Sequence, residues 1–131
     1  MANEIMLSDA NLVSVIEERG LGDLLKPLVK EIHLFDTYIA GTSFIEDTSV
    51  FEQLHMSEDL ILRREPDNKF DALAILILNS DGIKLGYVPR KDNLIFGRLL
   101  EAGKMLKGKI SDIEKKDSYY KIRIGIYLVD Y

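Results

Sequence analysis

The sequence of 131 residues contains no cysteine and no tryptophan, and it has only two histidines and three prolines. The absence of cysteine excludes disulfides, thiolate metal sites and cysteine nucleophiles, and two histidines alone argue against a structural zinc site. No glycine-rich phosphate loop of the Walker or Rossmann type is present. No serine lies in the glycine-flanked motif of a hydrolase nucleophile. We therefore expect a protein that is not an enzyme and that needs no metal or cofactor.

Long apolar runs are also missing from the chain. No stretch approaches the roughly 20 apolar residues that a membrane-spanning helix requires. The opening residues, MANEIMLSDANL, lack the basic segment and the apolar run of a signal peptide. The hydrophobic fraction of 47% and the charged fraction of 30% are typical of a globular protein. We expect no membrane partner and a cytoplasmic location.

The chain also lacks an excess of positive charge, since its formal net charge is −5 at pH 7. This charge argues against a protein that coats long nucleic acid through its phosphates. Residues 1–31 hold three basic and six acidic side chains and so contribute −3 of the total. Basic residues cluster locally in the remainder, at 63–64, 90–91 and 104–109. A compact site for one or two phosphates is compatible with this distribution.

The first 31 residues have the pattern of amphipathic helices. Ser8 is a typical helix N-cap, and Gly20 is a typical residue just after a helix end. Residues 21–29 predict a second short helix. We expect an N-terminal helical extension over 1–31 and a separate domain over 32–131. The apolar side chains of the first helix share one face: Leu12, Val13 and Ile16.

From residue 32 onward the pattern is mainly that of β-strands. Apolar and polar residues alternate over 122–128, which is the period of a half-buried strand. Asp81-Gly82 favours a hairpin turn, because Asp-Gly supplies the positive φ that such turns need. The expected class is mainly β (α+β), a small OB-like or SH3-like, partly open β-barrel of five to six strands with a central helix. The predicted strands cover 32–40, 60–64, 72–78, 83–88, 105–114 and 119–130, with helical segments at 48–54 and 92–102.

The two helical segments of this domain have expected apolar faces. In the short segment, Val50, Phe51 and Leu54 should point inward. The longer helix should end at Gly103, because glycine is the usual residue after a helix C-terminus. The apolar side chains of this helix are Leu94, Ile95, Leu99 and Leu100.

Three segments carry a family resemblance when they are taken in order and spacing. They are Ala40–Phe44 (AGTSF), Leu62–Ile75 (LRREPDNKFDALAI) and Gly82–Arg90 (GIKLGYVPR). Together they resemble the HIRAN family, whose pattern joins a glycine-and-aromatic loop, an R-E-P-x-N-x-[YF]-D-x-x-A-[IV] segment and a G-x-x-[IL]-G-[YH]-[VL]-P-[RK] segment. The resemblance covers about residues 32–130, and the middle motif is the most specific of the three.

The resemblance implies an OB-like barrel that binds single-stranded DNA and recognises a free 3′-hydroxyl end, linked to DNA repair or processing. Family members occur fused to helicase-like proteins or stand alone, so a helicase or nuclease is an implied partner. By the same resemblance Asp71 accepts a hydrogen bond from the terminal hydroxyl, and Phe44 and Phe70 form stacking walls. Tyr87 and Arg90 face the sugar-phosphate.

Two further positions complete the expected DNA-binding set. Lys91 follows Arg90, and the resemblance implies that basic residues after this strand hold phosphates. Ser43 stands where DNA-end-binding members of the family have an arginine, and Phe44 stands where they have a tyrosine. This chain therefore lacks one cation and one hydroxyl of the family pattern in its first loop.

Each of these residues also has a purely structural interpretation. Pro66-Asp67-Asn68 is typical turn chemistry, and Asp71 is suited to cap backbone amides of the same turn. Phe44 and Phe70 could be core residues, Tyr87 could pack within a strand, and Arg90 and Lys91 could be solvated charges.

A second function is compatible with the sequence: a protein-interaction or oligomerisation domain without nucleic-acid binding, with homo-oligomers formed through the N-terminal helices. An exposed cluster of Phe44, Phe70 and Tyr87 beside Arg90 would favour DNA binding. A buried cluster and an apolar surface along Leu12, Val13, Ile16 and Leu24 would favour the protein-interaction alternative.

Overall fold

The computed structural model describes residues 30–130 of the chain. The predicted N-terminal helices lie outside the described residues. Within 30–130, no helix is long and apolar enough to cross a membrane. The elements follow in the order β1 (Lys30–Tyr38), η3 (Thr42–Phe44), α3 (Ser49–Glu52), β2 (Asp59–Arg64), β3 (Ile75–Leu78), β4 (Lys84–Tyr87), α4 (Arg90–Glu101), β5 (Met105–Lys115) and β6 (Tyr120–Asp130).

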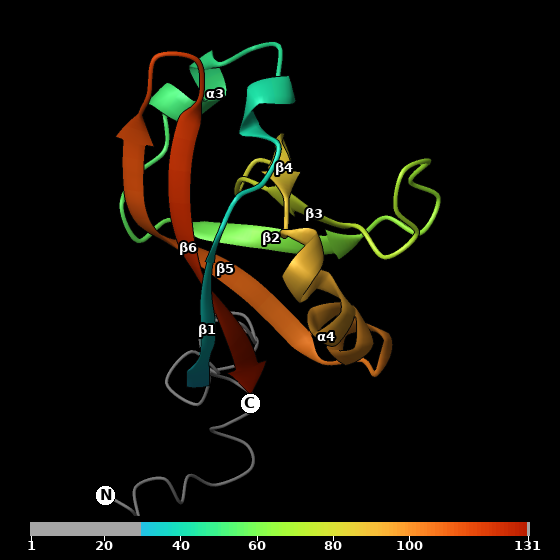
Figure 1. The fold of residues 1–131 in the computed structure, drawn as a ribbon. Helices are drawn as coiled ribbons and strands as arrows, with labels where there is room; N and C mark the ends of the chain where they lie inside the picture. Colours follow the sequence, from blue (N-terminus) through green and yellow to red (C-terminus); the bar gives the residue numbers. More distant parts are fainter. Residues whose placement is uncertain (1–29, 131) are drawn as a thin grey trace, which may run out of the picture. The chain divides into compact units, whose positions relative to one another are not determined.

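The six strands form one sheet in the order β1-β6-β5-β2-β3-β4. Strands β5 and β6 form the longest antiparallel ladder, from the Met105–Val129 pair to the Lys115–Tyr120 pair. Strand β2 pairs antiparallel with both β5 and β3. In Figure 1, β2 lies crosswise to the long strands β5 and β6, so the sheet curls strongly on itself.

The chain that follows β1 brings the two ends of the sheet together. The Ile39 amide donates to the Ile122 carbonyl of β6 at 2.9 Å, and the next residue pairs with β4. Ala40 and Tyr87 exchange two backbone hydrogen bonds of 2.8 and 2.9 Å. This single bridge closes the curled sheet at one point, so the prediction of a small, partly open barrel of five to six strands is confirmed.

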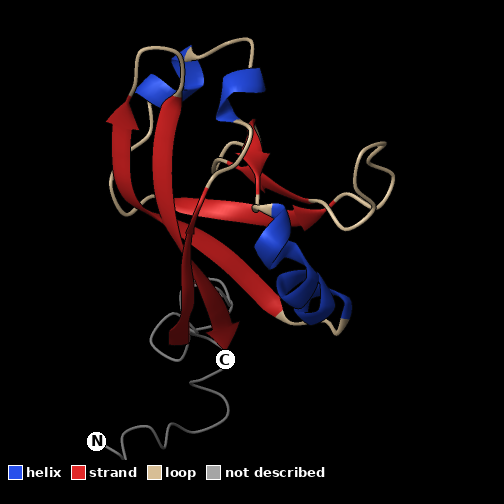
Figure 2. Cartoon of the chain, viewed as in Figure 1, coloured by secondary structure: helices blue, strands red, loops and turns tan. Residues whose placement is uncertain are grey.

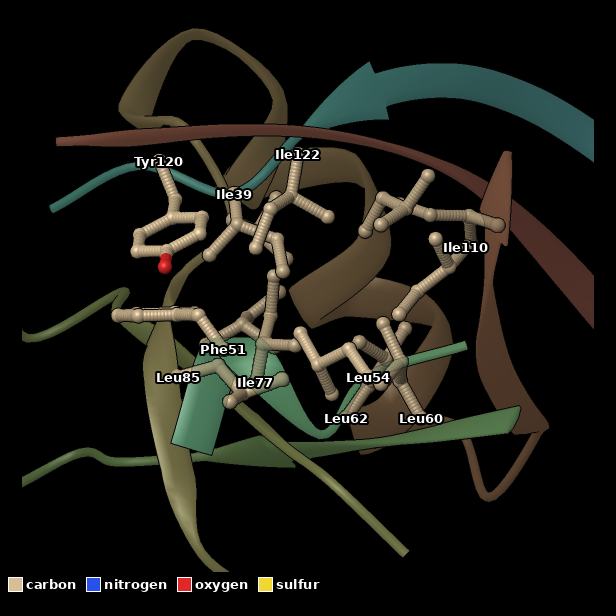
Figure 3. Close-up of a cluster of buried hydrophobic side chains, with 14 of the residues drawn as sticks. Ile39, Phe51, Leu54, Leu60, Leu62, Ile77, Leu85, Ile110, Tyr120 and Ile122 are labelled. Atoms are coloured by element: carbon tan, nitrogen blue, oxygen red, sulfur yellow. The ribbon is translucent and has the colours of Figure 1, made fainter. Parts of the chain in front are cut away.

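The barrel core is apolar, and its side chains come from several strands of the sheet and from α3 and α4. On β6, Ile122, Ile124 and Ile126 are fully buried, as the alternating pattern predicted. Phe51 of α3 stacks on Tyr120 with 4.9 Å between ring centroids, and the predicted inward packing of the short helical segment is confirmed. Figure 3 shows side chains from different parts of the barrel meeting in this core: Ile39, Leu60, Leu62, Ile77, Leu85 and Ile122.

The predicted hairpin between β3 and β4 is confirmed. The Asn79 amide donates to the Ile83 carbonyl at 2.9 Å, and Gly82 adopts the predicted positive φ of 84°. The strand before the hairpin is shorter than expected, since it begins at Ile75 and not at residue 72. The reason is a turn, in which Asp71 Oδ1 accepts a hydrogen bond from the Leu73 amide at 2.9 Å and removes that amide from strand pairing.

Helix α4 ends as predicted, and the face that it buries includes polar residues. Gly103 has a φ of 83°, and its amide donates to the Leu100 carbonyl at 3.0 Å. Leu94 and Ile95 are 49% and 65% exposed, so these two apolar side chains do not pack on the barrel. Two polar residues of the first turn and Phe96 are buried in their place. Hydrogen bonds from those polar residues set the rotation of the helix, as described below.

Candidate nucleic-acid interface

Three segments distant in the sequence meet beside the closing bridge of the barrel. They are the loop at 40–44, the β2–β3 loop at 65–74, and residues 87–93 at the end of β4 and the start of α4. Figure 2 shows the β2–β3 loop projecting from the barrel. The segments line two adjoining pockets of about 340 and 780 Å³. We call the two pockets together the cleft. The residues that line both pockets are Phe44, Asn68, Phe70, Tyr87 and Arg90.

Two aromatic rings of the cleft are almost fully exposed. Phe44 is 87% exposed and Phe70 is 86% exposed. The interpretation of these residues as core side chains is therefore wrong. The turn that carries Phe44 is itself fixed, because the buried Thr42 hydroxyl donates to the Tyr120 carbonyl at 2.7 Å. Two large apolar rings are thus held in solvent by ordered backbone, which is unusual unless they serve a binding surface.

Asn68 organises the β2–β3 loop with both ends of its amide group. Its Oδ1 accepts from the Phe70 amide at 2.8 Å and from the Asp71 amide at 3.0 Å. Its Nδ2 donates to Glu65 Oε1 at 2.7 Å and to the Tyr87 hydroxyl at 3.3 Å. The turn interpretation of Asn68 is confirmed, and this turn sets the position from which Phe70 and Asp71 extend.

Tyr87 and Glu65 join this turn to the barrel. The Tyr87 hydroxyl donates to Glu65 Oε1 at 2.7 Å. Hydrogen bonds from Asn68 and Tyr87, together with the nearby charge of Lys84, hold the pKa of Glu65 below its ordinary value. Lys84 Nζ lies 4.6 Å from the centroid of the Tyr87 ring. Tyr87 is half-buried, so it serves strand packing and the cleft surface together.

Asp71 lines the cleft, and its carboxylate is held on two sides. Its Oδ1 accepts from the Leu73 amide, and its Oδ2 accepts from Asn93 Nδ2 at 2.8 Å. Arg90 Nε lies 3.6 Å from the same Oδ2. The Leu73 amide, the Asn93 side chain and the Arg90 charge lower the pKa of Asp71, and burial opposes them only in part. Asp71 is therefore an ionised acceptor at neutral pH, and 21% of its side chain remains exposed.

Arg90 connects the start of α4 to the β2–β3 loop. One of its terminal nitrogens donates to the Phe70 carbonyl at 2.8 Å. The side chain is still 72% exposed. Because a guanidinium has five N–H donors, most of them remain available to a ligand such as a phosphate.

The structure brings together five of the seven sequence-predicted site residues. Ser43 lies in a separate pocket with Tyr38 and Tyr119, and Lys91 is directed towards the Tyr38 ring, 5.8 Å from its centroid. Ser43 and Lys91 therefore do not line the cleft, because the tight η3 turn and the first helical turn direct successive side chains apart. The five that do line it are Phe44, Phe70, Asp71, Tyr87 and Arg90.

Sequence reasoning missed three residues that shape this site. Glu65 stands in the R-E-P part of the middle motif, so the motif could have identified it as a site residue. Lys84 stands between Gly82 and Gly86, the two glycines of the third motif. Asn93 lies within a predicted helix, and no local pattern distinguishes it from a solvated polar residue.

Replacing Asn68 by alanine is expected to lower the free energy of unfolding by about 2 kcal/mol, because the Phe70 and Asp71 amides lose their acceptor. Urea denaturation measures the change. The matched control is Asp67→Ala, an exposed neighbour in the same loop, with an expected change below about 0.5 kcal/mol. Equal losses in the two variants would contradict the organising role of Asn68.

The fold defines a small OB-like β-barrel module, and the cleft lies at the closure of its sheet. The HIRAN domain model matches residues 32–129, so the chain belongs to the HIRAN domain family. The resemblance drawn from the three motifs is confirmed. HIRAN domains are nucleic-acid-binding modules, and the family places this chain in that general class.

Solved structures support the same fold. The crystal structure of a protein from Lactobacillus plantarum has a TM-score of 0.73 at 20% identity, covering 79% of this chain and 99% of that one. The crystal structure of the HIRAN domain of human HLTF has a TM-score of 0.63 at 13% identity, covering 77% and 78%. Among curated proteins, none matches this chain in sequence.

Proposed function

We propose that the cleft binds single-stranded DNA at a 3′-hydroxyl end and that the chain is a binding module without catalytic activity of its own. The observation that carries the proposal is the pair of exposed rings, Phe44 and Phe70, lining the same cleft as the fixed carboxylate of Asp71. A helicase or nuclease would supply the catalytic activity from another chain, in DNA repair or processing.

The two rings suit unstacked bases. A base stacked on an aromatic side chain contributes about 1–3 kcal/mol without requiring a particular sequence. Bases in a duplex already stack on each other, so a ring of this kind favours single strands and ends. Phe44 and Phe70 present their rings to solvent without rearrangement, which avoids the cost of ordering them upon binding.

The carboxylate of Asp71 suits a hydroxyl and opposes a phosphate. An ionised carboxylate accepts hydrogen bonds only, and each of its oxygens can accept more than one. A terminal 3′-hydroxyl can donate to it, whereas a 3′-phosphate or an internal phosphodiester brings a second negative charge. Because Asp71 is fixed by Leu73 and Asn93, it cannot turn away from that charge without breaking a hydrogen bond.

Arg90 supplies the opposite charge in the same cleft. Its exposed guanidinium can bind the phosphate that precedes the terminal nucleotide through two donors. An acceptor for the end and a cation for the preceding phosphate then define a direction along the strand. This arrangement needs no strongly basic protein, in agreement with the net charge of −5.

The direct test is a titration of fluorescent oligothymidine carrying either a 3′-hydroxyl or a 3′-phosphate. A hydrogen bond to a charged group contributes about 1.5–3 kcal/mol, so we expect the hydroxyl strand to bind about 10- to 100-fold more tightly. Asp71→Asn keeps the shape of the side chain and removes its charge. We expect this variant to bind the two strands about equally.

The remaining outcomes of this titration are equally informative. Equal binding of both strands by the unmodified chain would show phosphate attraction without end recognition. Binding of neither strand would exclude the proposal and leave the protein-interaction alternative. The exposed rings of Phe44 and Phe70 disagree with the buried cluster that would favour this alternative. The N-terminal helices lie outside the described residues, so the homo-oligomer that they would form stays a prediction.

A further inference from the structure

The first turn of α4 directs polar side chains towards the protein interior. Asp92 is 9% exposed and Asn93 is 2% exposed, and both face packed chain. A buried polar group costs free energy unless it is hydrogen-bonded. Asp92 Oδ2 accepts from the Thr37 hydroxyl of β1 at 2.9 Å. Asn93 donates to Asp71 at 2.8 Å. These two bonds fix the rotation of α4 on the barrel.

The Asn93 bond differs in kind from the Asp92 bond. It reaches from the helix to a loop residue that lies in the cleft, 22 positions earlier in the chain. Asn93 lines one of the two pockets, but at 2% exposure it offers a ligand very little surface of its own. We therefore expect its main effect on a ligand to come from the orientation and charge of Asp71.

We propose that Asn93 is a positioning residue that sets the selectivity of the cleft for a hydroxyl end, by holding Asp71 away from Arg90. The inference rests on the proposed function and adds a residue to it. Arg90 Nε lies 3.6 Å from the Oδ2 that Asn93 binds, beyond a direct hydrogen bond. The two groups form a loose ion pair, and the Asn93 bond keeps it from closing into a direct hydrogen bond.

Loss of the Asn93 donor changes both charges together. The carboxylate is then free to turn towards Arg90 and form a direct, charge-assisted pair. In that pair Asp71 has fewer free acceptor positions for a terminal hydroxyl, and Arg90 has fewer free N–H donors for a phosphate. The negative charge that repels a 3′-phosphate is also neutralised. The cleft would keep its rings and lose its distinction between the two ends.

The test uses Asn93→Leu, which removes the donor and keeps a side chain of similar volume. The ratio of affinities for 3′-hydroxyl and 3′-phosphate oligothymidine is expected to fall about tenfold. Carbon-13 NMR of the free chain follows the Asp71 carboxyl group, whose pKa is expected to fall further below its ordinary value, because a direct pair with the Arg90 cation replaces the hydrogen bond from a neutral amide. A rise towards the ordinary value would show that no such pair forms and would overturn the inference. Asn93→Ser, which keeps a shorter donor, is expected to give a smaller change in both measurements. If the leucine variant does not fold, the serine variant decides.

The matched control is Asn79→Ala. Asn79 is also buried, at 7% exposure, and its Oδ1 accepts two backbone amides in the β3–β4 hairpin. This variant should lose stability and keep the affinity ratio and the Asp71 pKa. If Asn93→Leu behaves like Asn79→Ala, Asn93 is structural and the inference is wrong.

Failure of the inference is distinguishable from failure of the proposed function. Equal binding of both strands by the unmodified chain would overturn the proposed function, and the inference would fall with it. Clear hydroxyl preference in the unmodified chain with an unchanged ratio in Asn93→Leu would overturn the inference alone.

Discussion

Replacing Gly86 by alanine is expected to lower the free energy of unfolding by about 3 kcal/mol and to open the barrel. A Cβ atom at this position would lie 2.3 Å from the Ala40 carbonyl oxygen and 2.6 Å from Ile39 Cγ2. The carbonyl cannot move aside freely, because it accepts the Tyr87 amide at 2.9 Å in the bridge that closes the sheet. Relief of the clash therefore separates β4 from the segment that follows β1.

Urea denaturation of Gly86→Ala measures this loss, and Gly97→Ala is its matched control. Gly97 lies in α4, and the nearest atom to its added Cβ is Ile75 Cδ1 at 4.0 Å. Alanine is favoured over glycine within a helix, so the control should gain up to about 1 kcal/mol. A Gly86→Ala chain as stable as the unmodified protein would show that the bridge does not hold the barrel closed.

Removal of either exposed ring is expected to give the largest loss of DNA binding. Phe44→Ala and Phe70→Ala should each weaken binding of 3′-hydroxyl oligothymidine by about 10- to 100-fold, because each deletes a stacking surface of about 1–3 kcal/mol. Since both rings are more than four-fifths exposed, the free energy of unfolding should change by less than about 0.5 kcal/mol. Fluorescence titration and urea denaturation measure the two quantities.

The control for ring removal is Ile83→Ala in the β3–β4 hairpin. Ile83 is 50% exposed and lies outside the residues that line the cleft. Its truncation should leave DNA affinity unchanged. Phenylalanine variants that lose stability while keeping affinity would assign the rings to packing and remove the principal support for the proposed function.

Most of the fold could be predicted because period and turn chemistry are local. The alternation over 122–128 gave β6, and Asp81-Gly82 gave the hairpin. The face of α4 could not be predicted in this way. Leu94 and Ile95 are apolar and exposed, whereas Asn93 is polar and buried, and its partner Asp71 is distant in the sequence. Hydrogen bonds between distant residues leave no period in a single chain.

The candidate site was also predicted only in part. The family motifs placed Phe44, Phe70 and Asp71 correctly in one cleft, and the structure decided that both rings are exposed. Motif membership alone did not reveal that Ser43 faces another pocket, because the direction of a side chain in a tight turn depends on backbone geometry. The predicted capping of a turn amide by Asp71 is confirmed, and the structure adds that the same residue also lines the cleft.

The sparse cations of the cleft have a consequence for binding in salt. In the part of the chain that the structure describes, the basic residues lining the two pockets are Lys69, Lys84 and Arg90. A single strand releases about 0.7 counterions for each phosphate that a cation neutralises, so three contacts release about two. Stacking on Phe44 and Phe70 releases none. As ionic strength rises, proteins that hold DNA through many phosphates lose affinity steeply. This domain should keep a larger share of its affinity for DNA.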